Sequence, residues 1–351
     1  MIGASLFSSA GIAETYFEEV GINIVAANEL VQERADLYQA LYPNSNMIAG
    51  NILDDKVFKA LVKSTPEKLD FLIASPPCQG MSVAGKNRNL EQMLKDERNY
   101  LVFKIIDFIK LKSPDFVLIE NVPTFFKMVL PYKNQHLKIT EILNLIFGKE
   151  YNIEAHVYDA AEYGVAQRRT RAIIKLYCKG KKWGQPIKSK EIITVEDKIG
   201  SLPSIEAGQK SKIKWHFARK HSNNHIEWMK HTPTGKTAFE NDKYFPVKPN
   251  GEKVKSYNTT YRRIKWDEPA PTITMRNDAI SSQLNVHPGR KLENGIYSDA
   301  RVLTPLELML LSSLPQDWNI PDNTPELLIR KCIGECIPPL LIKNIVAQIN
   351  Q

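Results

Sequence analysis

The chain has 351 residues, of which 43% are hydrophobic and 25% charged, and its net charge is +8. This composition is typical of a globular protein with one large domain and an appended module, or with two domains. Its longest apolar runs are far shorter than the ~20 residues that cross a bilayer, so we expect no membrane partner. The four cysteines are widely scattered, which argues against a disulfide scaffold and fits a reducing cytoplasm.

The first half of the chain alternates strand-like and helix-like segments. In chain order, we expect strands at 2–7, 22–28, 47–49, 69–75, 115–120, 153–159 and 170–177. The expected helices lie at 11–20, 31–41, 54–63, 96–111 and 135–147. Alternation of this kind predicts an α/β fold with a doubly wound, mostly parallel, Rossmann-like sheet.

The pattern changes after a stretch rich in glycine, proline and lysine that ends near residue 186. We therefore expect a main domain over 1–186, a smaller irregular domain over 187–310 and a final segment over 311–351. The final segment is helical from residue 325. We expect it to pack back on the main domain through one apolar face, made of Ile342, Ile345, Val346 and Ile349.

A cysteine follows the fourth expected strand. The apolar run 71–75 ends at Pro76 and Pro77, which have no N–H to donate to a strand ladder. The chain must turn there, so Cys78 lies just beyond the carboxyl end of the strand, where open α/β sheets bind ligands. Such a thiol is either a nucleophile or a buried, inert cysteine, and this stretch alone favours neither.

Other polar side chains are expected at the same edge. Glu120 ends the strand at 115–120 and could act as an acid there. Arg169 and Arg171 alternate at the start of the last strand, so the period of two places them on one face. Either arginine could instead bind a phosphate.

The turn after the first strand is made of small residues and reads Phe7-Ser8-Ser9-Ala10-Gly11-Ile12. Turns of this kind let a cofactor approach the backbone and a helix N-terminus. The second strand runs into Glu29, a carboxylate that either takes the hydroxyls of a ribose or is simply exposed.

Positive charge is concentrated in residues 208–265, which hold 14 lysines and arginines against 4 acidic residues. This local excess is larger than the net charge of the whole chain, and aromatic residues are interleaved with it. The segment therefore predicts a folded surface that binds a polyanion. Cys332 and Cys336 are four apart, but no second Cys or His pair follows them, so we expect no metal site.

Taken in this order, the motifs resemble those of the DNA (cytosine-5) methyltransferase family over the whole chain. Two of them are specific to that family, namely Pro76-Pro77-Cys78-Gln79-Gly80 and Glu120-Asn121-Val122. Further similar stretches are Ser5 to Gly11, Asp96 to Leu101, Gln167 to Arg171, Glu268 to Thr274, Leu303 to Glu307 and Ile333 to Pro339. The chain departs from the family at Ser9, Asn51 and Glu335, where Gly, Asp and Asn are usual.

The resemblance implies methyl transfer from S-adenosyl-L-methionine to C5 of a cytosine flipped out of double-stranded DNA. In this reading Cys78 attacks C6, Glu120 assists at N3, and Arg169 or Arg171 holds the cytosine O2 or a phosphate. The loop at 80–99 closes over the base, and 187–310 recognises the target sequence. The implied cofactor residues are Phe7, Ser8, Ser9, Ala10, Gly11, Ile12, Glu29, Leu30, Asn51, Ile52, Ser75, Pro76, Leu101, Gly334, Glu335 and Cys336.

The same resemblance implies a monomeric prokaryotic modification enzyme paired with a restriction endonuclease. One alternative is an RNA cytosine-5 methyltransferase, but the Cys-Phe-Thr element typical of the tRNA-directed branch is missing. A second alternative is a catalytically silent DNA-binding protein, which would have no chemical need for both Cys78 and Glu120.

Overall fold

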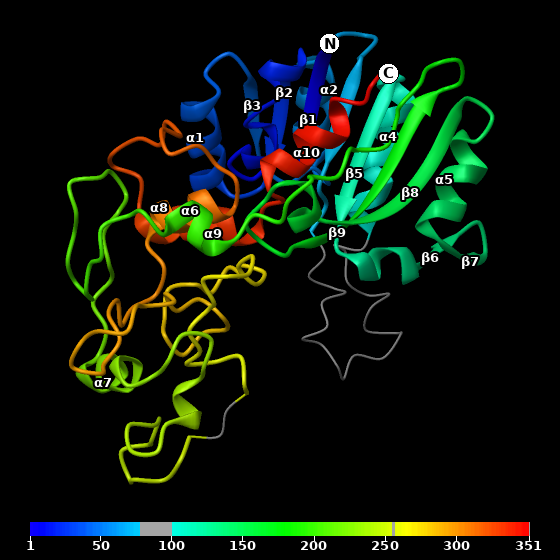
Figure 1. Cartoon of the computed structure of the whole chain (residues 1–351). Helices are drawn as coiled ribbons and strands as arrows, with labels where there is room; N and C mark the ends of the chain where they lie inside the picture. The colour runs from blue at the N-terminus through cyan, green and yellow to red at the C-terminus, as the bar shows by residue number, and fades with distance from the viewer. Residues whose placement is uncertain (78–99, 255–256, 351) are drawn as a thin grey trace. The chain divides into compact units, whose positions relative to one another are not determined.

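The computed structural model describes residues 1–77, 100–254 and 257–350 (Figure 1). The predictions for Cys78 and for the loop at 80–99 therefore concern residues outside the described ones. The chain divides into two compact units. Unit 1 comprises Met1–Asp159, Thr170–Ile187 and Ile342–Gln351, and unit 2 comprises Ala160–Arg169 and Lys188–Leu341. How function is shared between these units stays a prediction.

Unit 1 is built on a seven-stranded sheet, in the spatial order β3, β2, β1, β4, β5, β9, β8 (Figure 1). Its strands are β1 (Ile2–Leu6), β2 (Asn23–Glu29), β3 (Asn46–Ala49), β4 (Phe71–Ala74), β5 (Phe116–Asn121), β8 (Tyr151–Asp159) and β9 (Thr170–Cys178). Neighbouring strands from β3 to β5 pair in parallel, whereas β9 is antiparallel to both β5 and β8. The predicted mostly parallel, Rossmann-like α/β fold is confirmed.

The central strands form where apolar runs can be buried on both faces of the sheet. All four residues of β4 and all six of β5 are buried, which is the pattern expected of strands covered on both sides. In the parallel register, Leu6 lies beside Ala74, and Ala74 beside Ile119. The carboxyl ends of β1, β4 and β5 therefore meet at one edge, which we call the carboxyl edge.

The helices of unit 1 are α1 (Gln32–Leu41), α2 (Asp55–Lys63), α4 (Leu101–Lys112), α5 (Ile139–Phe147) and most of α10 (Pro339–Val346). Unit 2 contains α6 (Val195–Ile199), α7 (Asn223–Lys230), α8 (Pro305–Leu311) and α9 (Glu326–Glu335). Asp54 caps α2 by accepting the backbone N–H of Lys56 at 2.7 Å. Among the described residues, every helix is too short or too polar to cross a lipid bilayer.

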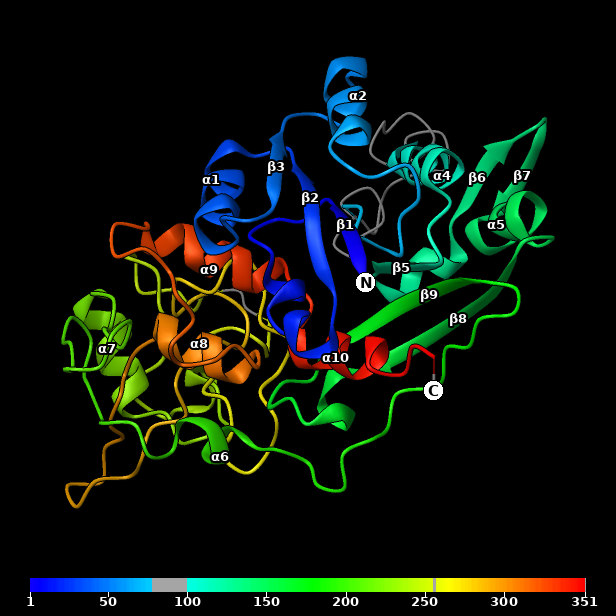
Figure 2. The ribbon, with the colours of Figure 1, turned by 90° about the horizontal axis from the view of Figure 1, so that it is seen from above.

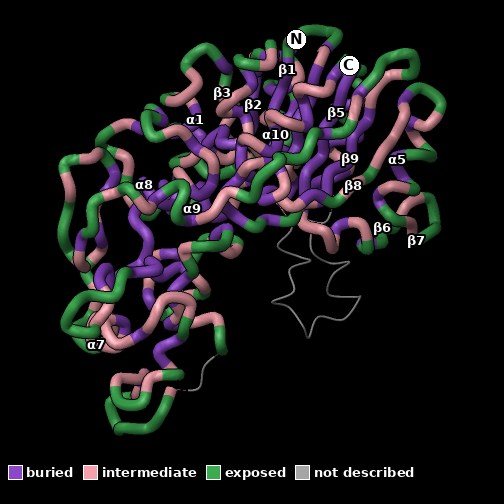
Figure 3. The backbone as a smooth tube through the Cα atoms, viewed as in Figure 1, coloured by how far each residue is buried: buried purple, intermediate pink, exposed green. Residues whose placement is uncertain are grey.

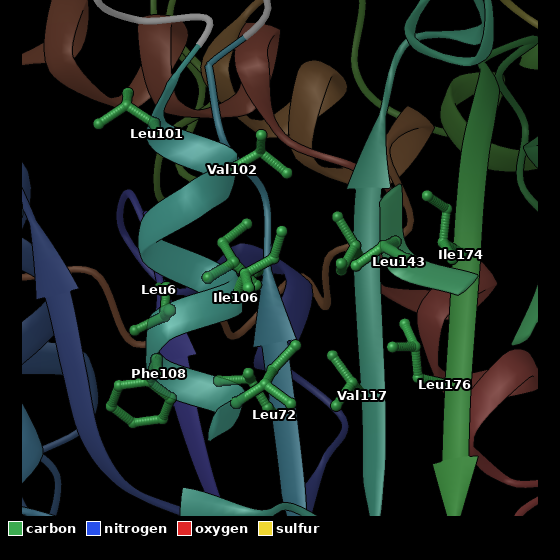
Figure 4. Close-up of a cluster of buried hydrophobic side chains, with 14 of the residues drawn as sticks. Leu6, Leu72, Leu101, Val102, Ile106, Phe108, Val117, Leu143, Ile174 and Leu176 are labelled. Atoms are coloured by element: carbon green, nitrogen blue, oxygen red, sulfur yellow. The ribbon is translucent and has the colours of Figure 1, made fainter. Parts of the chain in front are cut away.

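The main core lies between the sheet and α2, α4 and α5 (Figure 4). Leu6, Leu72 and Val117 come from adjacent strands, and they pack with Ile106 and Phe108 of α4. Figure 2 shows α10 on the opposite face of the sheet from α2 and α4, and Figure 3 shows buried residues running along the strands.

Trp183 connects the C-terminal segment to the sheet, on the face covered by α10. Its ring packs edge-on against Phe71 and Phe116, with ring centroids 6.4 and 5.7 Å apart. Its indole N–H donates to the carbonyl of Ile345 at 2.8 Å. The four residues of the predicted apolar face, from Ile342 to Ile349, are all buried.

Three expected elements differ from the structure. The segment at 11–20 forms two 3₁₀ turns, η1 (Ile12–Glu14) and η2 (Glu18–Val20), in place of one helix. Residues 135–138, expected as helix, form β7 (Gln135–Lys138) and pair with β6 (Val129–Tyr132). Between these two strands, Lys133 and Asn134 both have positive φ, the conformation that closes a two-residue hairpin. The helical end of the chain is broken after Glu335, just before Pro338 and Pro339.

Unit 2 is mostly irregular and is organised around buried charge as well as apolar packing. Arg301 is fully buried and donates to both carboxylate oxygens of Glu307, at 2.8 and 2.9 Å, and to Asp299 at 2.8 Å. A smaller apolar cluster includes Met229 and Tyr261. Buried guanidinium groups are tolerated only when paired in this way.

Because Leu72 is fully buried in the main core, Leu72→Ala is expected to lower the free energy of unfolding by about 2–5 kcal/mol. Urea titration followed by circular dichroism measures this change. Leu145→Ala is the matched control, since Leu145 of α5 is 67% exposed. It should change the value by less than about 0.5 kcal/mol, and equal losses in the two variants would contradict the assigned core.

Candidate active site

The turn that leads to Cys78 is held at the carboxyl edge by a side chain from the neighbouring strand. The Ser75 N–H donates to the carbonyl of Leu6 at 3.2 Å. Asn121, at the end of β5 and 3% exposed, donates its side-chain amide to the carbonyl of Pro76 at 3.0 Å. Its amide oxygen accepts the N–H of Val122. Asn121 thus fixes the backbone two residues before Cys78, which itself lies outside the described residues.

Glu120 and Arg171 meet at the same edge as an ion pair. The Arg171 Nε atom lies 2.9 Å from Glu120 Oε1, and each side chain is 11% exposed. Arg171 can reach Glu120 because β9 is antiparallel to β5, so the start of β9 lies beside the end of β5. A partly buried, charge-assisted bond of this length orients both groups. Sequence reasoning predicted both residues but not their pairing.

Arg169 has a different environment from Arg171. It is 2% exposed and donates to the backbone carbonyls of Ile273 at 2.6 Å and Gly334 at 2.9 Å, all within unit 2. Because β9 begins at Thr170, the strand alternation does not extend to Arg169. The two arginines therefore do not share one strand face, as the sequence had suggested, and Arg169 braces the interior of unit 2.

The turn after β1, residues Phe7 to Gly11, has an unusual backbone and is called the glycine turn here. Phe7 and Ser9 have φ of 59° and 50°, and Gly11 has φ of 72°. Side chains disfavour this left-handed region, so surrounding bonds must impose it. The N–H of Ser8 donates to the carbonyl of Asn28 at 3.0 Å, and that of Gly11 to Ser8 at 2.9 Å.

Glu29, at the end of β2, is one of the groups that hold this turn. It is 5% exposed, and its two carboxylate oxygens accept the N–H groups of Ser9 and Val31, both at 2.9 Å. Leu30, next in the chain, is 64% exposed despite being apolar. A carboxylate at this position can accept hydrogen bonds from the hydroxyls of a nucleoside. The exposed apolar side chain beside it can pack against the base.

The ends of β2 and β3 are joined by Asn28, which sequence reasoning missed. Its amide donates to the carbonyls of Ile48 at 2.8 Å and Gly50 at 3.1 Å. An asparagine inside an otherwise apolar strand was the signal for this role, because strands are depleted in Asn. Asn51 is exposed, and its side-chain oxygen accepts the N–H of Leu53 at 3.0 Å. That oxygen keeps a second lone pair for another donor.

The residues at this edge fit a small polar cofactor. The Ser9 Oγ atom is buried and has no hydrogen-bond partner among the described residues, which leaves a polar group for a ligand to satisfy. Ile52 is buried and Leu101 begins α4 in the main core. Gly334, Glu335 and Cys336 lie at the end of α9 in unit 2, and their part in a cofactor site stays a prediction.

Comparison with known proteins decides the family. A family model described as C-5 cytosine-specific DNA methylase matches residues 1–351. The chain belongs to this family. It is 59% identical to the Type II methyltransferase M1.HgaI of Avibacterium volantium, over 99% of this chain and 98% of that protein. It is 28% identical to the Type II methyltransferase M1.HphI of Haemophilus parahaemolyticus, over 97% and 84% of the two chains.

Solved structures support the fold of this methylase. A prophage-encoded protein described as a DNA modification methyltransferase (E. coli) superposes with a TM-score of 0.68 at 19% identity, over 99% of this chain and 98% of that one. The Entamoeba histolytica methyltransferase EhMeth gives a TM-score of 0.65 at 15% identity, over 98% and 96%. At these identities the likeness concerns the fold alone.

The methylase also buries a carboxyl group beneath the glycine turn. Glu14 of η1 is 4% exposed, accepts a hydrogen bond from the Tyr38 hydroxyl at 2.6 Å and is hydrogen-bonded to Ser5. Burial raises the pKa of Glu14 to about 7, although the bonds from Ser5 and Tyr38 oppose the shift. The groups that face this carboxyl are therefore hydroxyls, so its negative charge is poorly compensated.

This raised pKa makes the stability of the methylase depend on pH. The folded state keeps the Glu14 proton up to about pH 7, whereas the unfolded chain loses it near its usual value of 4.5. The stabilisation is present below the unfolded pKa and is lost as pH rises through the folded one. Relative to Glu14→Gln, the wild-type protein should lose roughly 2 kcal/mol of unfolding free energy between about pH 5 and pH 8.

Urea titrations at both pH values test this expectation. Glu33→Gln is the control, because Glu33 is exposed on α1, and it should follow the wild type at each pH. A constant difference between wild type and Glu14→Gln across the range would show that burial does not shift this carboxyl.

Proposed function

We propose that this protein transfers a methyl group from S-adenosyl-L-methionine to C5 of a cytosine flipped out of a specific double-stranded DNA sequence. Its family supports the reaction, and its Type II relatives support a role as the modification enzyme of a restriction-modification system. One structural observation carries the proposal. The Glu120–Arg171 pair and the turn before Cys78 are held at one edge of one sheet.

The chain's own residues would perform the chemistry in a definite order. The Cys78 thiolate attacks C6 of cytosine, forming an S–C6 bond and moving electron density toward C5. Glu120 supplies a proton or hydrogen bond to N3, which stabilises the charge that develops on the ring. Arg171, held against Glu120, would donate to the cytosine O2. After methyl transfer, a base removes the C5 proton and Cys78 leaves, which restores the C5–C6 double bond.

The bound cofactor supplies an electrophilic methyl group and is left as S-adenosyl-L-homocysteine. The glycine turn, Glu29, Leu30, Asn51 and Ile52 would hold it, together with Ser75, Pro76 and Leu101. Each Glu29 oxygen already accepts one backbone N–H and retains capacity for a ribose hydroxyl. Ser9 Oγ would find its missing partner in this ligand.

The basic segment of unit 2 would bind the DNA backbone. Several of its lysines are already paired with acidic residues, as Lys236 is with Glu240 and Lys248 with Glu252. Lys210, Lys212 and Lys220 are exposed and make no ion pair with any described residue. These three lysines are therefore candidates for phosphate contacts.

The other proposed features follow from the family and its relatives. DNA, not RNA, is the favoured substrate, because the matching family is one of DNA methylases and the relatives include Type II methyltransferases. We expect the enzyme to act as a monomer in the cytoplasm of a bacterium or archaeon, beside a cognate restriction endonuclease.

Cys78→Ala is expected to abolish methyl transfer, because alanine has no thiol to form the bond to C6. Bisulfite sequencing of DNA from cells that express each variant would reveal the methylated cytosine and its sequence context. Wild-type enzyme should form a covalent adduct with DNA that carries 5-fluorocytosine at this position, since fluorine blocks loss of the C5 proton. Cys178→Ala, a change at a partly buried cysteine of β9, should retain activity. Full methylation by Cys78→Ala would refute the mechanism.

The triple variant Lys210→Gln, Lys212→Gln, Lys220→Gln is expected to weaken DNA binding and to flatten its salt dependence. Each lost phosphate contact should lower the slope of log K against log salt by about 0.9, so the slope should fall by roughly 2–3. Fluorescence anisotropy over a range of salt measures it. The control variant changes three exposed lysines of unit 1 to glutamine, Lys110, Lys149 and Lys179. An equal fall of the slope in this control would show that the DNA binds elsewhere on the protein.

A further inference from the structure

We propose that Tyr42, together with Tyr38 and Glu14, positions the glycine turn and so sets how tightly this methylase holds its cofactor. The inference rests on the proposed cofactor site and adds positioning residues to it. None of the three side chains belongs to the motifs that carry the resemblance to the family. Glu14 lies in η1, Tyr38 lies in α1, and Tyr42 is the residue that follows and caps α1.

Two tyrosine rings lie directly against the backbone of the turn. The Tyr42 hydroxyl donates to the carbonyl of Gly11 at 2.7 Å. A Cβ atom added to Gly11 would lie 2.3 Å from the Tyr42 ring and 2.8 Å from the Tyr38 ring. The two rings also contact each other, with centroids 4.9 Å apart. The backbone at Gly11 is therefore enclosed by these rings and cannot relax toward them.

The tyrosines are held in turn by Glu14. The Tyr38 hydroxyl donates to the Glu14 carboxyl at 2.6 Å and lies 3.3 Å from the Ser45 hydroxyl. Burial, with Glu14 nearby, raises the pKa of Tyr38, and burial likewise raises that of Tyr42. Both hydroxyls therefore keep their protons and remain donors. The chain of contacts runs from the Glu14 carboxyl through Tyr38 and Tyr42 to the Gly11 carbonyl.

This support matters because the turn is conformationally unfavourable. Phe7 and Ser9 carry side chains and yet have positive φ, and Ser9 occupies a position where glycine is usual in the family. Conformations of this kind persist only where the surroundings impose them. Glu29 does so at Ser9, through the bond to its N–H. Gly11 adopts its positive φ without strain but is flexible, and the bond from Tyr42 restrains it. Loss of the second restraint should leave the turn sampling geometries that do not fit the ligand.

Tyr42→Phe tests this role, because it removes one hydroxyl and keeps the ring. Isothermal titration of the full-length protein with S-adenosyl-L-homocysteine should show Kd raised about fivefold, the effect of one typical net hydrogen bond. KM for S-adenosyl-L-methionine should rise in parallel, while kcat at saturating cofactor and Kd for DNA stay within about twofold. Tyr132→Phe, on β6 outside the cluster, is the matched control and should leave all four values unchanged.

A second variant guards against a general loss of structure. Tyr38→Phe breaks the bond to Glu14. In the double variant with Glu14→Gln, the change in log Kd should be smaller than the sum of the two single changes, as expected for partners in one contact. An unchanged Kd in Tyr42→Phe, or a rise matched by an equal loss of DNA affinity, would overturn the proposal. Failure of the wild-type protein to bind S-adenosyl-L-homocysteine would instead refute the cofactor site itself.

Discussion

Parallel pairing of β1, β2, β3, β4 and β5 is the constraint on which the site depends. Parallel strands bring their carboxyl ends to one edge, so turns that are far apart in the sequence become neighbours. The Ala74–Ile119 register sets the turn before Cys78 beside Glu120 and Asn121. One reversed strand completes the arrangement, because only an antiparallel β9 can bring its first residues, with Arg171, to the end of β5.

The polar side chains at this edge form hydrogen bonds with the backbone of neighbouring turns. Asn121 holds Pro76, Asn28 holds the end of β3, and Glu29 holds Ser9. Each of these side chains replaces a ladder bond where a strand has ended and the chain turns sharply. Rigid turns of this kind keep reactive groups in place before substrate arrives, which lowers the cost of organising them during the reaction.

Much of the fold could be predicted from the sequence, as could the position of Glu120 at the carboxyl edge. Apolar runs closed by proline or by a carboxylate marked β4 and β5, and the order of motifs predicted the roles of Cys78 and Glu120, which stay predictions. Contacts between distant residues could not be predicted, because periodicity reports which way a side chain faces and not what it meets. The reversed direction of β9, the different settings of Arg169 and Arg171, and the burial of Glu14 against Tyr38 are all of this kind. The β6–β7 hairpin was missed because its turn, Lys133-Asn134, lacks the glycine that usually marks one.

The division of the chain limits how unit 2 could be exchanged between methylases. Unit 2 includes the ten-residue excursion Ala160–Arg169 between β8 and β9, as well as Lys188–Leu341. A chimaera that grafted only the longer piece would set the host's equivalents of Gln167 and Arg169 against foreign backbone. Here these side chains bond to Ser312, Ile273 and Gly334, and a buried guanidinium without acceptors is strongly destabilising. Unit 2 is thus discontinuous in the sequence, and a single pair of crossover points would either leave Ala160–Arg169 behind or carry β9 of unit 1 along with it.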